Sequence, residues 1–225
     1  MRNLSAVILL SSVVAAAGGS DVVFASEDTE RLEAASQTLQ DIVTIPDKGI
    51  PEDLLRKARC VVVVPSLKKG AFIVGAEYGK GFVSCRAVKS RQWSAPAAIR
   101  MEGGSVGFQI GGSETEVVLL VMNDKGADRL MSSEFKLGAD ASVAAGPVGR
   151  TANAATDPTM RAEILAWSKS RGVFAGVSLS GSTVREDRDV NKSLYGKELG
   201  TRDVTSGQVA ATAEGKPLLA LLARY

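Results

Sequence analysis

The residue types that support catalysis are sparse in this chain, and one of them is missing. The sequence contains no histidine. Ser-His-Asp and Cys-His nucleophile systems, most zinc sites and histidine acid–base catalysis all need that side chain. Two cysteines without histidine also make a poor metal site. The composition therefore excludes several large classes of enzymes, and we expect neither a metal nor a cofactor.

Three short motifs resemble catalytic sequences, and each fails on its surroundings. The pentapeptide 103–107 (GGSVG) matches a nucleophile elbow, but that motif needs a helix after it and a histidine base. Residues 75–80 resemble a phosphate-binding loop, yet the glycines lie too close together and Gly81 replaces the magnesium-binding Ser or Thr. S-x-x-K matches at Ser66 and Ser133 lack the partner motifs of penicillin-type enzymes. Nothing here argues for an enzyme, so we expect a non-catalytic protein.

The remaining chemistry is cationic. Basic side chains lie just before and within the first β-rich region, where they would suit anionic head groups. The formal net charge is only +2, so we do not expect a nucleic-acid binder. The candidate lipid-binding residues are Arg56, Lys57, Arg59, Lys68, Lys69 and Lys80. The alternative is an ordinary mixed surface, because acidic residues alternate with these cations.

Residues 1–25 are typical of an export signal. Arg2 supplies a positive start, and Leu4 to Ala17 is an apolar stretch of suitable length, followed by small residues. Cleavage after Ala17 or after Ala25 fits this pattern. The alternative is an N-terminal membrane anchor, for which the stretch is short. No cysteine precedes Cys60, so a bacterial lipoprotein signal is absent. We expect an exported, periplasmic or extracellular, soluble protein with a single domain over 26–225.

Cys60 and Cys85 are the only thiols. In an oxidising compartment two cysteines pair, and the strand that begins at Cys60 could lie beside the one that contains Cys85. Both cysteines also stand in apolar strand contexts, where cysteine behaves as a small buried hydrophobe. The sequence leaves a disulfide and a pair of buried free thiols as open alternatives.

Short helices around a glycine-rich sheet would position these side chains. Apolar residues recur at helical spacing over 27–43, and further helices are expected over 51–58, 125–134, 187–195 and 216–224. Three glycine-rich hairpins are expected, with turns at 79–81, 111–113 and 169–172. We therefore predict an α+β fold: an antiparallel, barrel-like sheet built from repeated hairpins, flanked by helices.

Motifs spread over residues 50–200 resemble those of the SYLF family, a lipid-binding module found from bacterial envelopes to membrane-trafficking proteins. Each motif is weak alone, but their order is specific. They are Pro51 with Leu54-Leu55 and Ala58, Val61–Pro65, Lys69–Phe72 with Val74-Gly75, Gly79-x-Gly81, Trp93-x-x-Pro96, Gly107-x-x-Ile110-Gly111, Leu137–Ala141, Gly146–Gly149, Gly172–Val177, and Asn191 with Tyr195-Gly196. The resemblance implies lipid binding, with phosphoinositide recognition and actin association in eukaryotic relatives.

The first helix departs from the family's pattern. In eukaryotic members lipid contact is attributed to a basic amphipathic helix at the start of the domain, whereas Arg31 is the only basic residue of 27–43. An acidic helix is repelled by an anionic membrane. We therefore place lipid contact on the candidate cations and do not carry over actin association. The expected function is a non-catalytic module of the cell envelope that binds anionic phospholipid or a membrane surface. The alternative is an envelope protein-interaction or structural module without a lipid ligand.

Overall fold

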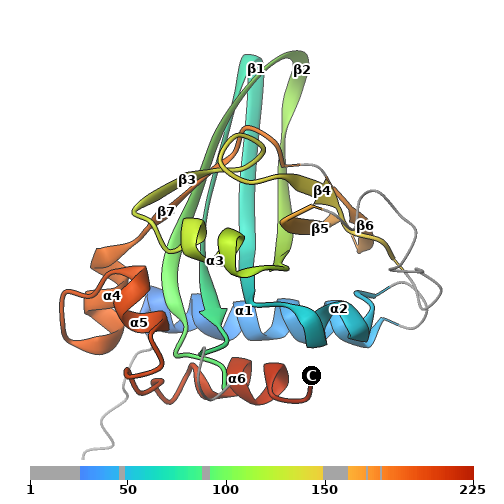
Figure 1. The fold of residues 1–225 in the computed structure, drawn as a ribbon. Coiled ribbons are helices and arrows are strands. Elements are labelled where there is room, and N and C mark those ends of the chain that lie inside the picture. The colour runs from blue at the N-terminus through green and yellow to red at the C-terminus, as the bar shows by residue number, and fades with distance from the viewer. Residues whose placement is uncertain (1–25, 46–48, 88–91, 149–161, 171, 178) are drawn as a thin grey trace, which may run out of the picture.

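The protein is described by a computed structural model that covers residues 26–45, 49–87, 92–148, 162–170, 172–177 and 179–225. The expected export signal, residues 1–25, lies outside this range. The described helices are α1 (Glu27–Thr44), α2 (Glu52–Lys57), α3 (Asp124–Leu130), α4 (Arg188–Tyr195), α5 (Thr201–Thr205) and α6 (Lys216–Leu222). The described strands are β1 (Cys60–Cys85), β2 (Ala97–Val121), β3 (Glu134–Lys136), β4 (Val143–Ala145), β5 (Ile164–Ser170), β6 (Val173–Gly176) and β7 (Thr183–Glu186) (Figure 1).

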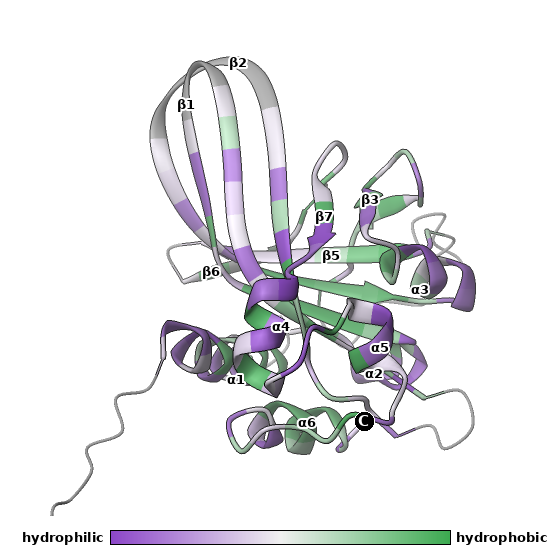
Figure 2. Ribbon diagram, turned by 90° about the vertical axis from the view of Figure 1, so that its left-hand side faces the viewer, coloured by the Kyte–Doolittle hydropathy of each residue, from purple (hydrophilic) through white to green (hydrophobic). Residues whose placement is uncertain are grey.

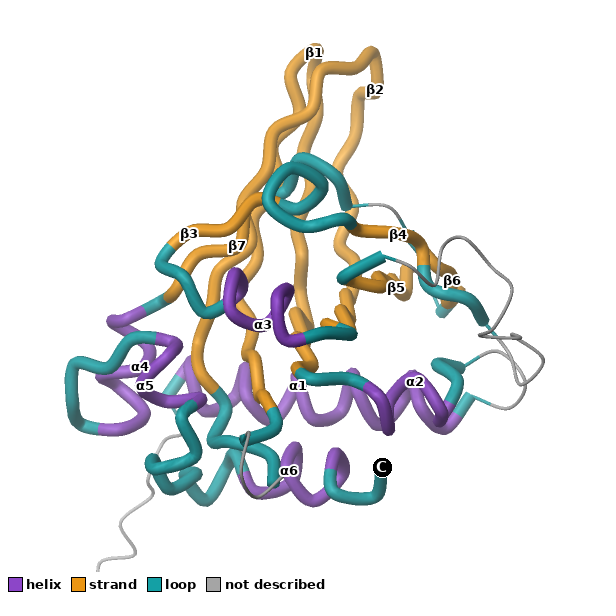
Figure 3. The backbone as a smooth tube through the Cα atoms, in the orientation of Figure 1, coloured by secondary structure: helices purple, strands orange, loops and turns teal. Residues whose placement is uncertain are grey.

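Two very long strands organise the molecule. β1 and β2 pair antiparallel along their length, from Cys60 opposite Val121 to Val83 opposite Ala97. The ribbon that they form rises above the body, turns over and returns, so each strand has an outgoing and a returning limb (Figures 1 and 3). The two ends of β1 therefore meet at the base of the molecule.

The other strands extend this ribbon into a curled sheet. The order is β3-β7-β2-β5-β4, with β1 paired to β2 and β6 paired to β5. Every pairing between the described strands is antiparallel except that between β4 and β5. The predicted α+β fold with an antiparallel, barrel-like sheet is confirmed.

Each face of the sheet covers its own apolar core, because alternate strand residues point to opposite faces. Val61 and Val63 lie on the side of the helices, where they pack in one cluster with Leu32 and Leu39 of α1 and Leu218 of α6. The neighbouring residues Cys60, Val62 and Val64 belong to the core inside the curl, which α3 and α5 close. In Figure 2 the strands are most hydrophobic in the body and more hydrophilic along the projecting ribbon.

Most predicted helices are confirmed with small shifts at their ends. Ser26 and Asn123 cap α1 and α3, accepting hydrogen bonds from the backbone N–H groups of Thr29 (3.3 Å) and Gly126 (2.8 Å). The third helix stops at Leu130 rather than reaching 134, which already belongs to β3. The five-residue helix α5 was not predicted, because it is too short to show periodicity. No described helix combines the length and hydrophobicity needed to span a bilayer.

The predicted hairpin turn at 79–81 is wrong. β1 runs straight through it, with Lys80 opposite Arg100 of β2. Gly79 and Gly81 instead let the returning limb of β1 press against the outgoing limb. A Cβ on Gly79 would lie 2.5 Å from the carbonyl oxygen of Ser66, and one on Gly81 would overlap the carbonyl oxygen of Val63.

The other two predicted turns have different outcomes. β2 passes through 111–113 as a strand, so the second turn is also wrong. The third hairpin is confirmed: β5 pairs with β6 from Ser170 opposite Val173 to Trp167 opposite Gly176, and Gly172 has a φ of 78°.

Candidate functional site

The structure does not bring the six candidate cations together. They fall into three groups that lie on different parts of β1 and the segment before it. Arg56, Lys57 and Arg59 form what we call the basic corner, where α2 meets β1; Lys68 and Lys69 lie on the outgoing limb of β1; Lys80 lies on its returning limb. A single six-residue lipid site is therefore not formed.

Within the basic corner the three cations differ in their partners. Arg56 is exposed and makes ion pairs with Glu52 (3.3 Å) and Asp53, one turn back on α2. Lys57 is exposed and has no ion pair among the described residues. Arg59 is largely covered, with 22% of its side chain exposed, and its Nε donates to Asp124 of α3 at 2.5 Å. Lys57 is thus the most available charge of this corner.

The two lysines on the outgoing limb of β1 differ in whether they form an ion pair. Lys68 is exposed and has no ion pair among the described residues. The Nζ of Lys69 lies 2.9 Å from the carboxylate of Glu77, which joins the two limbs of the ribbon. Lys69 therefore contributes to holding the two limbs of β1 together.

Lys80 is a structural residue. Its Nζ lies 3.2 Å from the carboxylate of Asp187, of which only 4% is exposed. The same carboxylate accepts a hydrogen bond from the N–H of Val190 (3.2 Å) and so caps α4. Lys80 therefore neutralises the buried carboxylate that caps α4.

We expect the Lys80→Gln variant to lose about 1–2 kcal/mol of unfolding free energy and to keep the ligand binding of the parent. Removing one partner of a fully buried pair costs about 3–5 kcal/mol. The effect here is smaller because about a third of Lys80 stays in contact with water. Urea denaturation measures it, with Lys68→Gln as the exposed-lysine control. A stability equal to that of the control would contradict this role.

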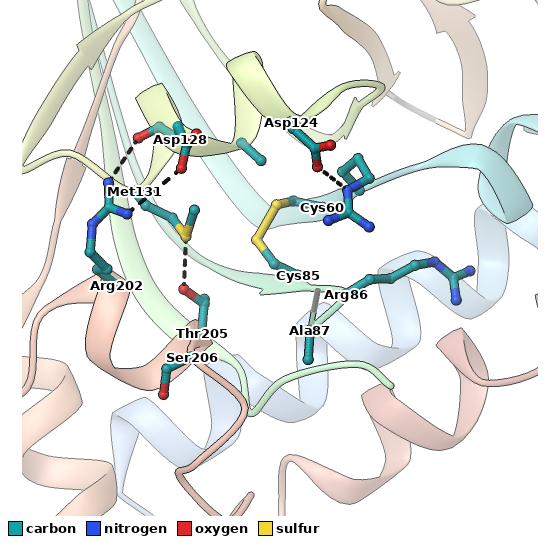
Figure 4. A pocket seen from close by; sticks show the side chains of 12 residues that line it. Cys60, Cys85, Arg86, Ala87, Asp124, Asp128, Met131, Arg202, Thr205 and Ser206 are labelled. Atoms are coloured by element: carbon teal, nitrogen blue, oxygen red, sulfur yellow. Dashed lines mark hydrogen bonds and ion pairs between the residues drawn. A yellow bond between two sulfur atoms is a disulfide. The ribbon is translucent and has the colours of Figure 1, made fainter. Parts of the chain in front are cut away.

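A pocket of about 320 Å³ opens at the base of the curled sheet, between the ends of β1 and the helices α3 and α5. We call it the barrel-mouth pocket (Figure 4). Apolar groups on its wall come from the two cysteines, Ala87, Ala127 and Met131. Its charged and polar lining residues are Arg59, Arg86, Asp124, Asp128, Arg202, Thr205 and Ser206.

The two cysteines of this pocket form a disulfide, which settles the alternative left open by the sequence. Cys60 and Cys85 stand at the two ends of β1, and both are buried. The backbone confirms how close the ends come, since the N–H of Arg86 donates to the carbonyl oxygen of Arg59 at 2.8 Å. The disulfide therefore ties the start of the outgoing limb to the end of the returning limb.

Ion pairs hold α3 across the mouth of the pocket. Asp124 pairs at one side with Arg59, the residue just before β1. At the other side Arg202 of α5 donates to the carbonyl oxygen of Asp128 (3.3 Å) and lies 3.7 Å from its carboxylate. Arg86 extends away from the disulfide (Figure 4), donates its Nε to the carbonyl oxygen of Ala58 (3.2 Å) and stacks 4.3 Å above the ring of Trp93. Arg59 and Arg202 are thus the lining arginines that pair with the aspartates of α3.

Helix α1 does not present a membrane-binding face. Its apolar residues Leu32, Leu39 and Ile42 are buried against the sheet and α6. Lys169 of β5 anchors its last turn, with Nζ 3.0 Å from the carboxylate of Asp41. This hydrogen bond lowers the pKa of Asp41 and raises that of Lys169. The apolar face that a membrane helix would insert is therefore already used by the core.

Sequence reasoning found one lining residue of this pocket among its cations, Arg59, and missed Arg202. Arg202 lies on α5, whose sequence TRDVT gives no periodic signal. Its contact with Asp128 of α3 forms only when α5 packs against the base of the curled sheet. No local pattern in the sequence carries that information.

Comparison with known proteins identifies a matching family and several relatives of this chain. The family Ysc84, described as "Las17-binding protein actin regulator", matches residues 102–225. An SH3 domain-containing protein of Schizosaccharomyces pombe is 38% identical over 177 residues, covering 77% of this chain and 40% of that protein. Protein YSC84 of Saccharomyces cerevisiae is 36% identical over 180 residues, covering 78% and 38%. The human SH3 domain-containing YSC84-like protein 1 is 33% identical over 178 residues, covering 79% and 52%.

The shared region is one part of these relatives, because the chain spans only about two-fifths to one half of their length. The family match covers more than half of the chain, and the relatives cover nearly four-fifths of it. The chain therefore belongs to the Ysc84 (SYLF) family.

Proposed function

We propose that this protein is a non-catalytic binding module of the cell envelope that attaches to anionic phospholipid surfaces at its base. The observation that carries the proposal is the combination found there: the exposed Lys57 of the basic corner lies two residues from Arg59, which lines a pocket with an apolar wall. A lipid surface offers the matching pair of features, an anionic head group above apolar chains. Each cation near such a surface contributes about 1 kcal/mol.

Vesicle co-sedimentation tests this proposal. The protein is expected to sediment with vesicles that contain anionic phospholipid and to stay in solution with vesicles of neutral phosphatidylcholine. Reversing two charges in the variant Lys57→Glu/Arg59→Glu is expected to weaken binding at least tenfold, because attraction becomes repulsion. Lys192→Glu is the matched control, since Lys192 is exposed on α4 and among the described residues pairs only with Glu198. Equal binding to neutral and anionic vesicles, or no effect of the double variant, would count against the proposal.

A protein-binding module without a lipid ligand is the second candidate. The description of the family as Las17-binding favours it, because that description names a protein partner. It predicts that the purified chain stays in solution with both kinds of vesicle. Absence of sedimentation, with the fold intact by circular dichroism, would therefore select this candidate.

The envelope location is part of the same proposal. A buried disulfide between Cys60 and Cys85 suits an oxidising compartment, where such bonds form and persist. The apolar sequence of residues 1–25 supports it independently. Mass analysis of the chain recovered from fractionated cells checks both points. A cytoplasmic chain that retains residues 1–25 and carries two free thiols would overturn the location.

A further inference from the structure

We propose that the barrel-mouth pocket binds one anionic amphiphile with a single apolar chain, its carboxylate or phosphate held by Arg59. The inference deepens the proposed function and rests on it, because it names the molecule that the base of the domain would take from a lipid surface. Three features carry it: the size of the pocket, the chemistry of its wall and the partners of its arginines.

The size limits the ligand. Small-molecule sites occupy about 300–1,000 Å³, and the pocket, at about 320 Å³, stands at the lower end. Two acyl chains with their glycerol and head group exceed that space. One chain segment with a small head group fits it. The pocket therefore selects single-chain molecules, or it takes one chain and leaves the rest of the ligand outside.

The wall favours an apolar chain with an anion at one end. Cys60, Cys85 and Ala127 present small apolar surfaces, and all three are buried in the surrounding core. Met131 adds a flexible thioether that adapts to chains of different shape. The disulfide fixes this wall, because it joins the two ends of β1 at the same point.

The arginines supply the anionic end. Arg59 is 22% exposed, and its partner carboxylate on Asp124 is 79% exposed. Arg202 and Asp128 are both more than half exposed. Pairs with such exposed carboxylates contribute only about 0–1 kcal/mol. A ligand anion can therefore replace Asp124 on Arg59, and the released aspartate returns to water.

Arg59 is expected to hold the ligand more strongly than Arg202. A charge-assisted hydrogen bond gains strength where water is excluded, and Arg59 is the more covered of the two. The planar fork of arginine also matches the two oxygens of a carboxylate. The Arg59→Lys variant keeps the charge and loses the fork, so it separates these contributions.

Titration of the mature chain with dodecanoate, below its micelle concentration, tests the pocket by calorimetry and native mass spectrometry. We expect one dodecanoate per chain, no binding of dodecyltrimethylammonium, and much weaker binding of acetate, which has the head without the chain. Arg59→Gln is expected to weaken dodecanoate binding at least tenfold, Arg59→Lys by less, and Arg202→Gln about threefold. Ser206→Trp, at the exposed edge of the pocket, is expected to block entry.

The control is Arg188→Gln, an exposed arginine on α4 that pairs with Glu186 and lies outside the pocket. Thermal unfolding of each variant shows whether a loss of binding comes from a loss of fold. Binding that is absent in the parent, or unchanged by both Arg59→Gln and Ser206→Trp, would overturn the inference. Loss of fold in Arg59→Gln leaves Ser206→Trp as the deciding variant.

The two proposals fail separately. If anionic vesicles bind while dodecanoate does not, the membrane attachment stands and the pocket ligand is wrong. If dodecanoate binds with the expected pattern while vesicles do not, the pocket takes a monomeric amphiphile from solution, and the proposed attachment to lipid surfaces is wrong.

Discussion

Replacing Cys60 and Cys85 together by alanine is expected to lower the free energy of unfolding by about 3.5 kcal/mol. The two residues are 25 positions apart, and closing a loop of that length in the unfolded chain accounts for this value. The bond also joins the limbs of β1 directly beside the barrel-mouth pocket. Loss of the bond is therefore expected to lower the local stability at the base of the sheet more than in the other parts of the sheet.

Urea denaturation with and without a reducing agent measures this effect. The parent is expected to lose stability on reduction, and the double variant is expected not to respond to the reductant. Hydrogen exchange at the backbone N–H of Arg86, which donates to Arg59 at 2.8 Å, reports the local loosening. A loss of less than about 1 kcal/mol in the double variant would show that the rest of the sheet already constrains these ends.

Gly146→Ala is expected to lower the free energy of unfolding by about 3 kcal/mol. An added Cβ would overlap the indole ring of Trp167, which is fully buried. The ring is held in place because its Nε1 donates to the carbonyl oxygen of Pro147 at 3.0 Å. The backbone cannot retreat either, because the carbonyl oxygen of Gly146 lies against Gly176. Overpacking of this kind typically costs about 1–3 kcal/mol, and two blocked directions place it at the upper end.

Gly70→Ala is the matched control for this substitution. A Cβ at Gly70 meets nothing within 4 Å, so its effect is expected to stay within about 0.5 kcal/mol. Chemical denaturation gives the two stabilities, and near-ultraviolet circular dichroism reports the packing of the tryptophan. Equal stabilities of the two variants would show that the sheet yields at Trp167 more easily than its hydrogen bond implies.

The helices and the glycines of β1 show which parts of the fold the sequence could and could not predict. Helices α1 and α4 were found because their ends and apolar spacing are local signals. The glycines of 79–81 were misread, since glycine serves both a turn and a close approach of two strands, and only the partner strand decides between them. The local sequence around these glycines does not show which strand will lie beside them in the fold.

The site was harder to predict than the fold. Charge alone grouped Lys80 with the surface cations, although its true partner, the buried Asp187, lies more than a hundred positions away. The disulfide stayed open for the same reason, because nothing local shows that the ends of β1 meet. The pocket needed α3, α5 and both ends of β1 at once, so only the closed base of the barrel reveals it.

The folded-over ribbon also has a consequence for the order in which the chain assembles. Within the β1–β2 ladder, Val83 and Ala97 are the paired residues nearest in sequence, and Cys60 and Val121 are the most distant. The entropy lost on closing a loop grows with its length, so pairing is least costly where the returning limb of β1 meets the start of β2. The ribbon is expected to zip from there, around its own tip, towards Cys60 and Val121. The two cysteines then come together only at the last stage, so the covalent bond seals a barrel that has already formed.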